Sequence, residues 1–408
     1  MKKNFDGLKR LNKKKTIYSL FEFPKAASNK DYDFSNNYEF RYLAKKKDDI
    51  NRKERKLERL TGYIQLQDSD KDALMRSRPK DYDKNSYRTI VNYSNSSDWL
   101  KKAQKKIHKY IVKELGEVEY LHSTIKSKSY ATNAFQHRGE NYTLAIDLKN
   151  FFTYVSREKL QYTLKDFLQI DSDVAFLYSS MLTSPVDEPP HHGGKYNLGQ
   201  GLPSSPILAY LCHASLFEYI YNNSLKEEIT MTVYVDDVVF SSVKPIPQHF
   251  IDRLFGLFKR NGLEINKDKI RLYMNGSTKK ITGTYVSPQK LSIPNRKHEE
   301  LHNLYQTLKE KKEKIETMDD YLFLYNIYLK FSGNYQYLIQ VECRGEDGKI
   351  SVNPRYKKFE KLNNELNILF PRGLKKKKKK TPYSKENMYF EEYKQLEEKY
   401  KLSVSRLK

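Results

Sequence analysis

The sequence predicts a mixed α/β or α+β fold, because strand-like and helix-like segments alternate through the middle of the chain. Residues 143–147 and 230–242 are rich in Val, Ile, Tyr and Thr, as β-strands are. The spacing of apolar residues is helical in segments 160–167, 207–221, 250–262 and, beyond Pro294, 298–330.

Two further helices are expected in the N-terminal third of the chain. Residues 99–115 carry an amphipathic stripe that stops at Gly116, a residue type that commonly ends helices. Residues 42–60 read as a highly charged helix with a sparse apolar stripe. Near the other end, six consecutive lysines (Lys375–Lys380) predict a solvated loop or a nucleic-acid contact.

Composition excludes several classes of protein. Hydrophobic residues make up 38% of the 408 residues and aromatic residues 13%, which is enough to exclude disorder throughout. No apolar run approaches the roughly 20 residues that span a bilayer, so no integral membrane protein is expected. The lysine-rich start argues against secretion. Two cysteines, Cys212 and Cys343, provide neither a disulfide framework nor a Cys-rich zinc site, and fit a reducing cytoplasm.

The net charge of +24 points to a polyanionic partner, most commonly nucleic acid. The alternative is that lysine serves here as a general solubilising residue. Charge alone does not separate these interpretations, and it says nothing about chemistry.

The segment Met231–Ser242 contains two adjacent carboxylates, Asp236 and Asp237, between two runs with strong β propensity. The pattern predicts a hairpin with both carboxylates at its exposed turn. Aspartate is also an ordinary turn residue, so the pair alone would be a weak signal of function.

A third carboxylate, Asp147, ends an apolar strand and is followed by two aromatic residues. A carboxylate at a strand end beside a carboxylate pair on a neighbouring hairpin makes a hard oxygen site for Mg²⁺. Two-metal nucleotidyl transfer needs such a site: one ion activates a primer hydroxyl and the other holds the triphosphate. Without cations, the crowded carboxylates would repel one another.

Between these segments lies Asn197–Leu211, a glycine-flanked turn with small polar residues that leads into a helix. Taken alone, it is a loop and a helix start. Beside the carboxylates, it would pack against an incoming nucleotide and its template base.

In this order, the three segments resemble the palm motifs of reverse transcriptases. The matching positions are Asp147–Phe152 (Asp-x-x-x-x-aromatic), Gln200–Pro206 (Gln-Gly…Ser-Pro) and Tyr234–Asp237 (Tyr-x-Asp-Asp). Segments 87–107 and 262–269 resemble a fingers segment and the next palm motif.

The resemblance implies a right-hand polymerase with an α+β palm that carries an antiparallel catalytic hairpin. We expect a basic, mostly helical N-terminal extension at 1–78 and fingers at 79–142. The palm would follow at 143–293, with a fingers insertion around 160–200. A helical thumb and a basic C-terminal region would occupy 294–408.

The resemblance also implies a role for individual residues in binding metal and nucleotide. Asp147, Asp236 and Asp237 would be the catalytic, metal-binding carboxylates, with the carbonyl of Leu148 as an extra ligand for two Mg²⁺ ions. The ring of Phe152 would exclude a ribose 2′-hydroxyl, whereas Phe151 would pack in the core. The remaining nucleotide-binding positions would be Gln200 and Gly201 beside the nucleotide, Arg88 and Lys80 on the triphosphate, and Lys269 on the departing pyrophosphate. For Lys80 and Lys269, a solvated surface lysine is the alternative.

Two short segments are similar to signatures of retron reverse transcriptases: Asn133-Ala134-x-x-His137, and Ile281-Thr282-Gly283, where that group carries Val-Thr-Gly. The alternative for His137 is a buried histidine bonded to backbone. Val235 stands in the Tyr-x-Asp-Asp motif where retron enzymes usually have Ala. The charged N-terminal stretch and the lysine-rich tail extend beyond a minimal retron polymerase. These departures leave a related, defence-associated reverse transcriptase open.

The helix beyond Pro294 would act as a thumb, with Leu301, Leu304, Tyr305 and Leu308 on its packed face. The basic residues expected to contact nucleic-acid phosphates are Arg296, Lys297 and Lys309 on this helix, and Lys375, Lys376 and Lys377 in the tail.

The resemblance implies RNA-directed DNA synthesis from dNTPs in a retron-type antiphage defence system. The partners would be a structured noncoding RNA, its DNA product and an effector protein, in the cytoplasm and without a membrane. The alternatives are a defence-associated enzyme that makes repetitive, protein-primed or untemplated DNA, and an inactive RNA-binding scaffold. A nuclease would have no use for the Gln-Gly…Ser-Pro segment, and Phe152 argues against an RNA polymerase.

Overall fold

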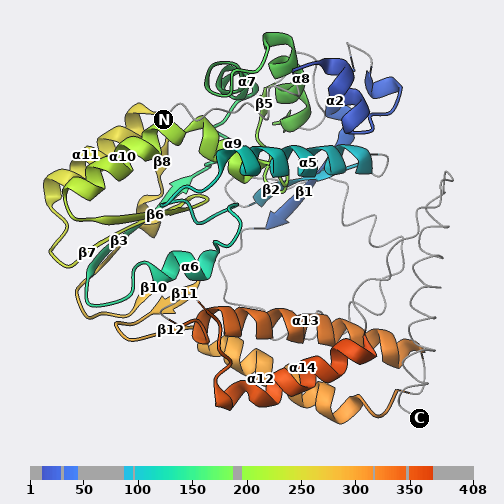
Figure 1. The fold of residues 1–408 in the computed structure, drawn as a ribbon, viewed down its shortest axis with the longest axis vertical. Helices are drawn as coiled ribbons and strands as arrows, with labels where there is room; N and C mark the ends of the chain where they lie inside the picture. The colour runs from blue at the N-terminus through green and yellow to red at the C-terminus, as the bar shows by residue number, and fades with distance from the viewer. Residues whose placement is uncertain are drawn as a thin grey trace. The chain divides into compact units, whose positions relative to one another are not determined.

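The structure, a computed structural model, describes residues 12–28, 32–44, 87–94, 97–186, 195–315, 318–345 and 349–370. The chain divides into two compact units, Met1–Thr282 and Gly283–Lys408 (Figure 1). Lys80 and Lys375–Lys380 lie outside the described residues. The predicted fingers, palm and thumb boundaries remain predictions.

The first unit is built on an antiparallel sheet whose central strand is β3 (Tyr142–Lys149). On one side, β3 pairs with β7 (Asp237–Ser242), which pairs with β6 (Thr230–Tyr234). On the other side, the short strands β8 (Glu264–Ile265) and β9 (Arg271–Tyr273) pair with different parts of β3. The predicted strand at 143–147 and the predicted hairpin at 230–242 are therefore confirmed.

Helices cover this sheet on both sides (Figure 1). On one side, α10 (Ala214–Lys226) contacts β6 and α11 (Gln248–Arg260) contacts β8. On the other side, α6 (Tyr130–Phe135) contacts β6. Because both faces are covered, the strands are mostly apolar and show no strict alternation.

Three predicted helices differ in detail from the observed ones. The segment 207–221 forms two helices, α9 (Ser205–Cys212) and α10, which meet at His213. The segment 160–167 continues α7 (Arg157–Tyr162) as a π-helix, η3 (Thr163–Phe167). The helix predicted at 99–115 is α5, which spans Asp98–Leu115 and ends at Gly116 with φ of +63°.

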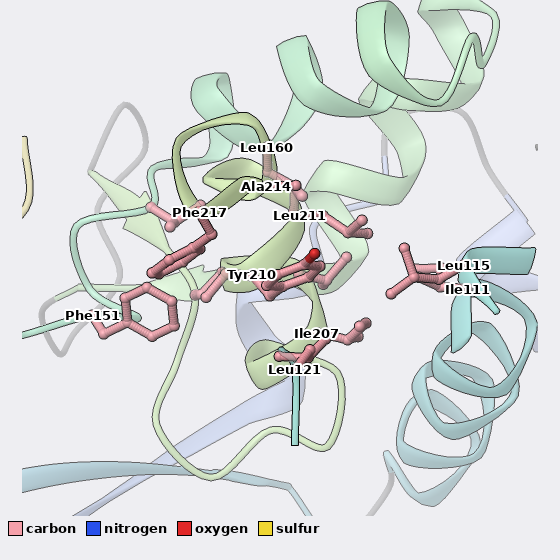
Figure 2. Close-up of a cluster of buried hydrophobic side chains, with 14 of the residues drawn as sticks. Ile111, Leu115, Leu121, Phe151, Leu160, Ile207, Tyr210, Leu211, Ala214 and Phe217 are labelled. Atoms are coloured by element: carbon pink, nitrogen blue, oxygen red, sulfur yellow. The ribbon is translucent and has the colours of Figure 1, made fainter. Parts of the chain in front are cut away.

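Buried side chains from distant segments form one core in this unit. Figure 2 shows Tyr210, Phe217 and Phe151 close together, with Ile111 and Leu115 of α5 nearby. The rings of Tyr210 and Phe217 stack with centroids 6.1 Å apart, and Phe151 meets Phe217 edge-on at 6.2 Å. This packing fixes the turn that directly follows β3.

A second sheet corrects one prediction. Strand β1 (Tyr38–Ala44) pairs antiparallel with β2 (Tyr87–Tyr93), so residues 42–44 do not begin the predicted charged helix. The alternating Tyr38, Phe40 and Tyr42 suit a strand, but the pairing partner is distant in sequence and its effect outweighs local helix propensity. Residues 45–60 lie outside the described residues.

Smaller elements complete the first unit. They are α2 (Lys14–Leu20), η1 (Ala26–Ser28), η2 (Phe34–Asn37), α8 (Ser172–Leu182), β4 (Ser184–Pro185), β5 (Tyr196–Asn197), η4 (Lys267–Lys269) and β10 (Lys279–Ile281).

The second unit is mostly helical, as predicted beyond Pro294. It contains β11 (Thr284–Val286), β12 (Leu291–Ser292), α12 (Asn295–Lys311), α13 (Met318–Glu342), η5 (Pro354–Tyr356) and α14 (Lys357–Leu369). Its helices pack around the buried rings of Tyr321, Tyr328 and Phe331 on α13. Within the described ranges of the chain, no helix is both long and apolar enough to cross a membrane.

Candidate active site

The β-sheet register brings the predicted carboxylates to one end of β3. Asp147 is the direct partner of Asp237 across the β3–β7 pair, and Asp236 lies in the turn just before β7. The Leu148 N–H donates to the carbonyl of Asp236 (2.8 Å), which ties this turn to β3. Three carboxylates from segments about 90 residues apart in sequence therefore belong to one local structure.

The turn itself is strained. Val235 has φ of +60°, a left-handed conformation that β-branched residues rarely adopt. Its N–H donates to Oγ of Ser123 (3.1 Å), a buried residue that the sequence analysis did not single out. Nothing in the local sequence around Ser123 indicates this contact.

Burial and crowding of like charges dominate the electrostatics. Burial, and then the nearby Asp236 and Asp147 carboxylates, raise the pKa of Asp237 from 3.8 to about 7, against a lowering influence from Lys269. The crowding expected from the sequence is therefore present in the structure.

Asp147 is held by two residues of the following palm segment. The Lys269 ammonium lies 2.9 Å from Oδ2 and 3.1 Å from Oδ1 of Asp147, and it is about half exposed. Asn266 donates from its backbone to the Asp147 carbonyl (2.9 Å) and from its side-chain amide to Oδ1 (3.3 Å). Lys269 thus lies beside Asp147, and its expected role with the departing pyrophosphate remains a prediction. The contact of Asn266 with Asp147 was not predicted.

The residues suit a hard divalent cation, because carboxylate oxygens are its preferred ligands and a cation would relieve the repulsion on Asp237. Over the described part of the chain, no three His, Cys, Asp or Glu side chains are already arranged around one metal position. The Asp147 carboxylate is held by its ion pair with the Lys269 ammonium. The side chain of Leu148 is buried, and its carbonyl remains a predicted ligand.

The predicted nucleotide-binding turn packs tightly against β2. Gly201 has φ of +108°, and a Cβ there would lie 2.5 Å from the carbonyl oxygen of Val91. The Gln200 carbonyl accepts a hydrogen bond from the Val91 N–H (2.7 Å). Because the backbone at position 201 lies so close to the Val91 carbonyl, only glycine can occupy this position. The strand also contains Arg88, whose side chain lies outside the described residues.

The two aromatic residues after β3 have different environments. Phe151 is buried in the core, as predicted. Phe152 is only partly buried against the same core, with its ring centroid 5.8 Å from that of Phe151. Phe152 lies just after the strand that carries Asp147, and its role in nucleotide selection remains a prediction.

Residues 78–321 match the family model described as "Reverse transcriptase (RNA-dependent DNA polymerase)". The chain belongs to the reverse transcriptase family. Among curated proteins, it is 30% identical over 218 residues to the retron Ec86 reverse transcriptase of Escherichia coli. The aligned region covers 52% of this chain and 63% of that protein. It is 24% identical over 208 residues to the retron Se72 reverse transcriptase of Salmonella heidelberg (49% of this chain, 52% of that protein).

This reverse transcriptase therefore resembles the retron type, and it covers less than two thirds of the length of these relatives. Among solved structures, it is similar to apo telomerase from Candida tropicalis (TM-score 0.39, 10% identity, 69% of this chain and 60% of that one). It is also similar to Candida albicans telomerase in complex with a fragment of telomeric RNA (TM-score 0.36, 12% identity, 68% and 53%).

The residues of the first retron-like segment are buried behind the hairpin of this reverse transcriptase. Asn133, Ala134 and His137 are all fully buried. The His137 ring is bonded to the side chains of Ser241 and Thr232, not to backbone as the alternative interpretation held.

The second retron-like segment follows β10. Ile281 is buried, and Oγ1 of Thr282 donates to the carbonyl of Tyr130 at the start of α6 (3.0 Å). Gly283 begins the second unit with φ of +84°. The first two residues of this segment therefore belong to the same unit as the first retron-like segment.

The predicted nucleic-acid contacts on the second unit lie along α12. Arg296 and Lys309 are exposed, whereas the Lys297 ammonium is bonded to Glu300 (2.9 Å) and Asn334 (3.2 Å). Of the residues expected on the packed face, Leu301 and Leu308 are buried, and Leu304 and Tyr305 are partly buried. Their role in binding nucleic acid remains a prediction.

A cavity of about 680 Å³ lies elsewhere in the first unit, between α5 and the loop that follows it. Its lining includes Lys109, Lys113, Thr124, Lys126 and Lys128, and none of the predicted site residues. It is therefore not part of the carboxylate site.

Proposed function

We propose that the protein is an RNA-directed DNA polymerase of a retron-type antiphage defence system that copies a structured noncoding RNA into DNA. The observation that carries this proposal is the pairing of Asp147 with Asp237 beside the turn that holds Asp236. Family membership and the similarity to retron enzymes support the reaction type.

Two Mg²⁺ ions would be held by Asp147, Asp236 and Asp237, with the carbonyl of Leu148 as a further ligand. When bound, such ions activate a primer hydroxyl as a nucleophile and neutralise triphosphate charge. The raised pKa of Asp237 supports this assignment, because burial and the neighbouring carboxylates destabilise its charged form, which a bound cation would stabilise.

The other residues would bind and orient the nucleotide. Lys269 would neutralise or protonate the departing pyrophosphate once its ammonium leaves Asp147. Gln200 and Gly201 would present backbone and side chain to the nucleotide, and Arg88 would grip the triphosphate with its planar fork. The ring of Phe152 would exclude the ribose 2′-hydroxyl, so that dNTPs are the substrates.

The proposed partners are the noncoding RNA, its DNA product and an effector protein. The net charge of +24 supports a polyanionic partner, and Arg296, Lys297, Lys309 and the tail lysines would contact its phosphates. A cytoplasmic setting is supported by Cys212 and Cys343, both of which are free thiols.

Primer extension by the purified chain tests the reaction. An RNA template with an annealed primer, dNTPs and Mg²⁺ should give a template-length DNA product, and omission of Mg²⁺ should abolish it. Extension with rNTPs in place of dNTPs should be weak. Absence of DNA synthesis on any primed RNA would contradict the proposal and favour the RNA-binding scaffold.

Sequencing the nucleic acid that co-purifies with the protein tests the biological setting. An RNA joined to a short DNA through a 2′–5′ branch would support the retron type. Long repetitive or untemplated DNA, or DNA attached to protein, would instead support the defence-associated alternative.

A further inference from the structure

The fully buried imidazole of His137 contacts both strands of the hairpin that carries Asp236 and Asp237. In His137, Nδ1 lies 2.7 Å from Oγ of Ser241, and Nε2 lies 2.7 Å from Oγ1 of Thr232. Thr232 is on β6 and Ser241 is on β7, so a single ring bridges both strands of the hairpin. All three side chains are buried.

The His137 ring matches its two hydroxyl partners chemically. Burial, together with the nearby His122 and Lys279, lowers the pKa of His137 to about 3, so the ring is neutral at physiological pH. A neutral imidazole has one N–H donor and one acceptor nitrogen, and each hydroxyl can donate or accept. Both bonds are therefore satisfied with either tautomer, and neither hydroxyl is left unpaired in the core.

The backbone around His137 is fixed by a buried lysine from β10. The Lys279 ammonium donates to the carbonyls of His137 (2.9 Å) and Gly139 (3.1 Å) and to Oδ1 of Asn141. These acceptors line the loop that leads into β3, the strand of Asp147. The backbone of His137 is thus held in the loop before β3, and its ring is hydrogen-bonded to both strands of the β6–β7 hairpin.

The tip of the hairpin has a support of its own. The segment before Ser123 pairs with the outer edge of β6, through His122 N–H to the Val233 carbonyl (2.8 Å) and Val233 N–H to the Tyr120 carbonyl (2.7 Å). This pairing places Oγ of Ser123 where it accepts from the N–H of the strained Val235 (3.1 Å).

We propose that His137 and Ser123 are positioning residues for the metal-binding hairpin: His137 fixes its two strands against the loop before β3, and Ser123 fixes its strained turn. The inference rests on the proposed function. Catalytic groups must be held within about 0.5 Å of their working geometry by supporting side chains. Neither residue touches the reacting groups; each acts through the backbone that carries Asp236 and Asp237.

Ser123→Ala, compared with Ser179→Ala, tests the support of the turn. Ser179 is a buried serine on α8 that donates to the carbonyl of Phe176 (2.9 Å), within its own helix. Ser123→Ala should lower kcat about tenfold with the KM for dNTP changed less than threefold, and should raise the Mg²⁺ concentration for half-maximal binding. Ser179→Ala should leave kcat and Mg²⁺ binding unchanged.

His137→Gln and His137→Leu test the imidazole bridge. The glutamine amide keeps one donor and one acceptor and should retain most activity and Mg²⁺ affinity. Leucine removes both and should reduce kcat per folded molecule by tenfold or more. Equal values of kcat per folded molecule for the two variants would overturn the role of His137. If the leucine variant does not fold, Thr232→Val replaces it.

Mg²⁺ binding, measured by calorimetry on the full chain without substrates, separates this inference from the proposed function. If the wild type binds Mg²⁺ but makes no DNA, the proposed function fails, and the variants' Mg²⁺ affinities still decide the positioning roles. If neither Ser123→Ala nor the loss of the His137 bridge changes Mg²⁺ affinity, the positioning proposal is wrong.

Discussion

Asp147 and Asp237 face each other as direct partners on adjacent antiparallel strands, and both are negatively charged when ionised. Like charges directly opposite one another destabilise a strand pair. The strand pair tolerates these two residues for two reasons. The Lys269 ammonium neutralises Asp147. The pKa of Asp237 is raised to about 7, so this carboxyl group is uncharged at lower pH.

The raised pKa predicts an unusual dependence of stability on pH. Between pH 4 and about 7, folded Asp237 holds a proton that the unfolded chain has released, so the free energy of unfolding falls as pH rises through this range. In EDTA, this loss should be on the order of 4 kcal/mol, since each unit of pKa difference corresponds to about 1.4 kcal/mol. Asp237→Asn should remove most of it, as measured by urea unfolding at several pH values.

Asp252→Asn is the matched control, because Asp252 is exposed on α11, away from the hairpin. It should retain the wild-type pH dependence. Equal pH dependence in the wild type and Asp237→Asn would show that Asp237 is not the titrating group.

Lys269 should compete with metal for Asp147 while assisting the departure of pyrophosphate. Lys269→Gln should therefore lower kcat by about 10²-fold and decrease the Mg²⁺ concentration needed for half-maximal binding. Steady-state kinetics and calorimetry measure the two effects. Lys267→Gln, a neighbouring exposed lysine, should change neither. An unchanged kcat in Lys269→Gln would exclude a role in the chemical step.

Gly201→Ala should destabilise the protein because the added Cβ would meet the Val91 carbonyl oxygen at 2.5 Å and because φ is +108°. A loss of about 2 kcal/mol or more in the free energy of unfolding is expected, together with a raised KM for dNTP. Gly256→Ala on α11 is the control: its Cβ meets nothing, and it should be neutral or stabilise by up to about 1 kcal/mol. Equal stability of the two variants would contradict the close approach.

Phe152→Ala should admit ribonucleotides. Steric exclusion by a ring on a well-packed turn can reject a 2′-hydroxyl, which a hydrogen-bonding pocket does poorly. Incorporation of rNTP relative to dNTP should rise by about 10²-fold, or roughly 3 kcal/mol of lost discrimination. Phe152→Tyr keeps the ring and should preserve selectivity. If the ratio of single-nucleotide extension efficiencies does not move in Phe152→Ala, Phe152 is not the selectivity residue.

The sequence predicted the strand of Asp147 and the hairpin of Asp236 and Asp237 because strand-forming residues precede Asp147 and lie on both sides of the Asp236–Asp237 pair. It could not predict that Tyr42 lies in a strand, because the partner strand begins at Tyr87. The contacts of His137 with Ser241 and of Ser123 with Val235 were equally hidden. Each joins residues about 100 positions apart, and tertiary packing alone brings them together.

The central claim is that Asp147, Asp236 and Asp237 form the catalytic centre for RNA-templated DNA synthesis. Its most direct test is single-turnover dNTP incorporation on a primed RNA by the wild type and by the double variant Asp236→Ala with Asp237→Ala. The double variant should bind the primed RNA as the wild type does, remain folded and incorporate nothing above background. Incorporation above background by the folded double variant would contradict the account.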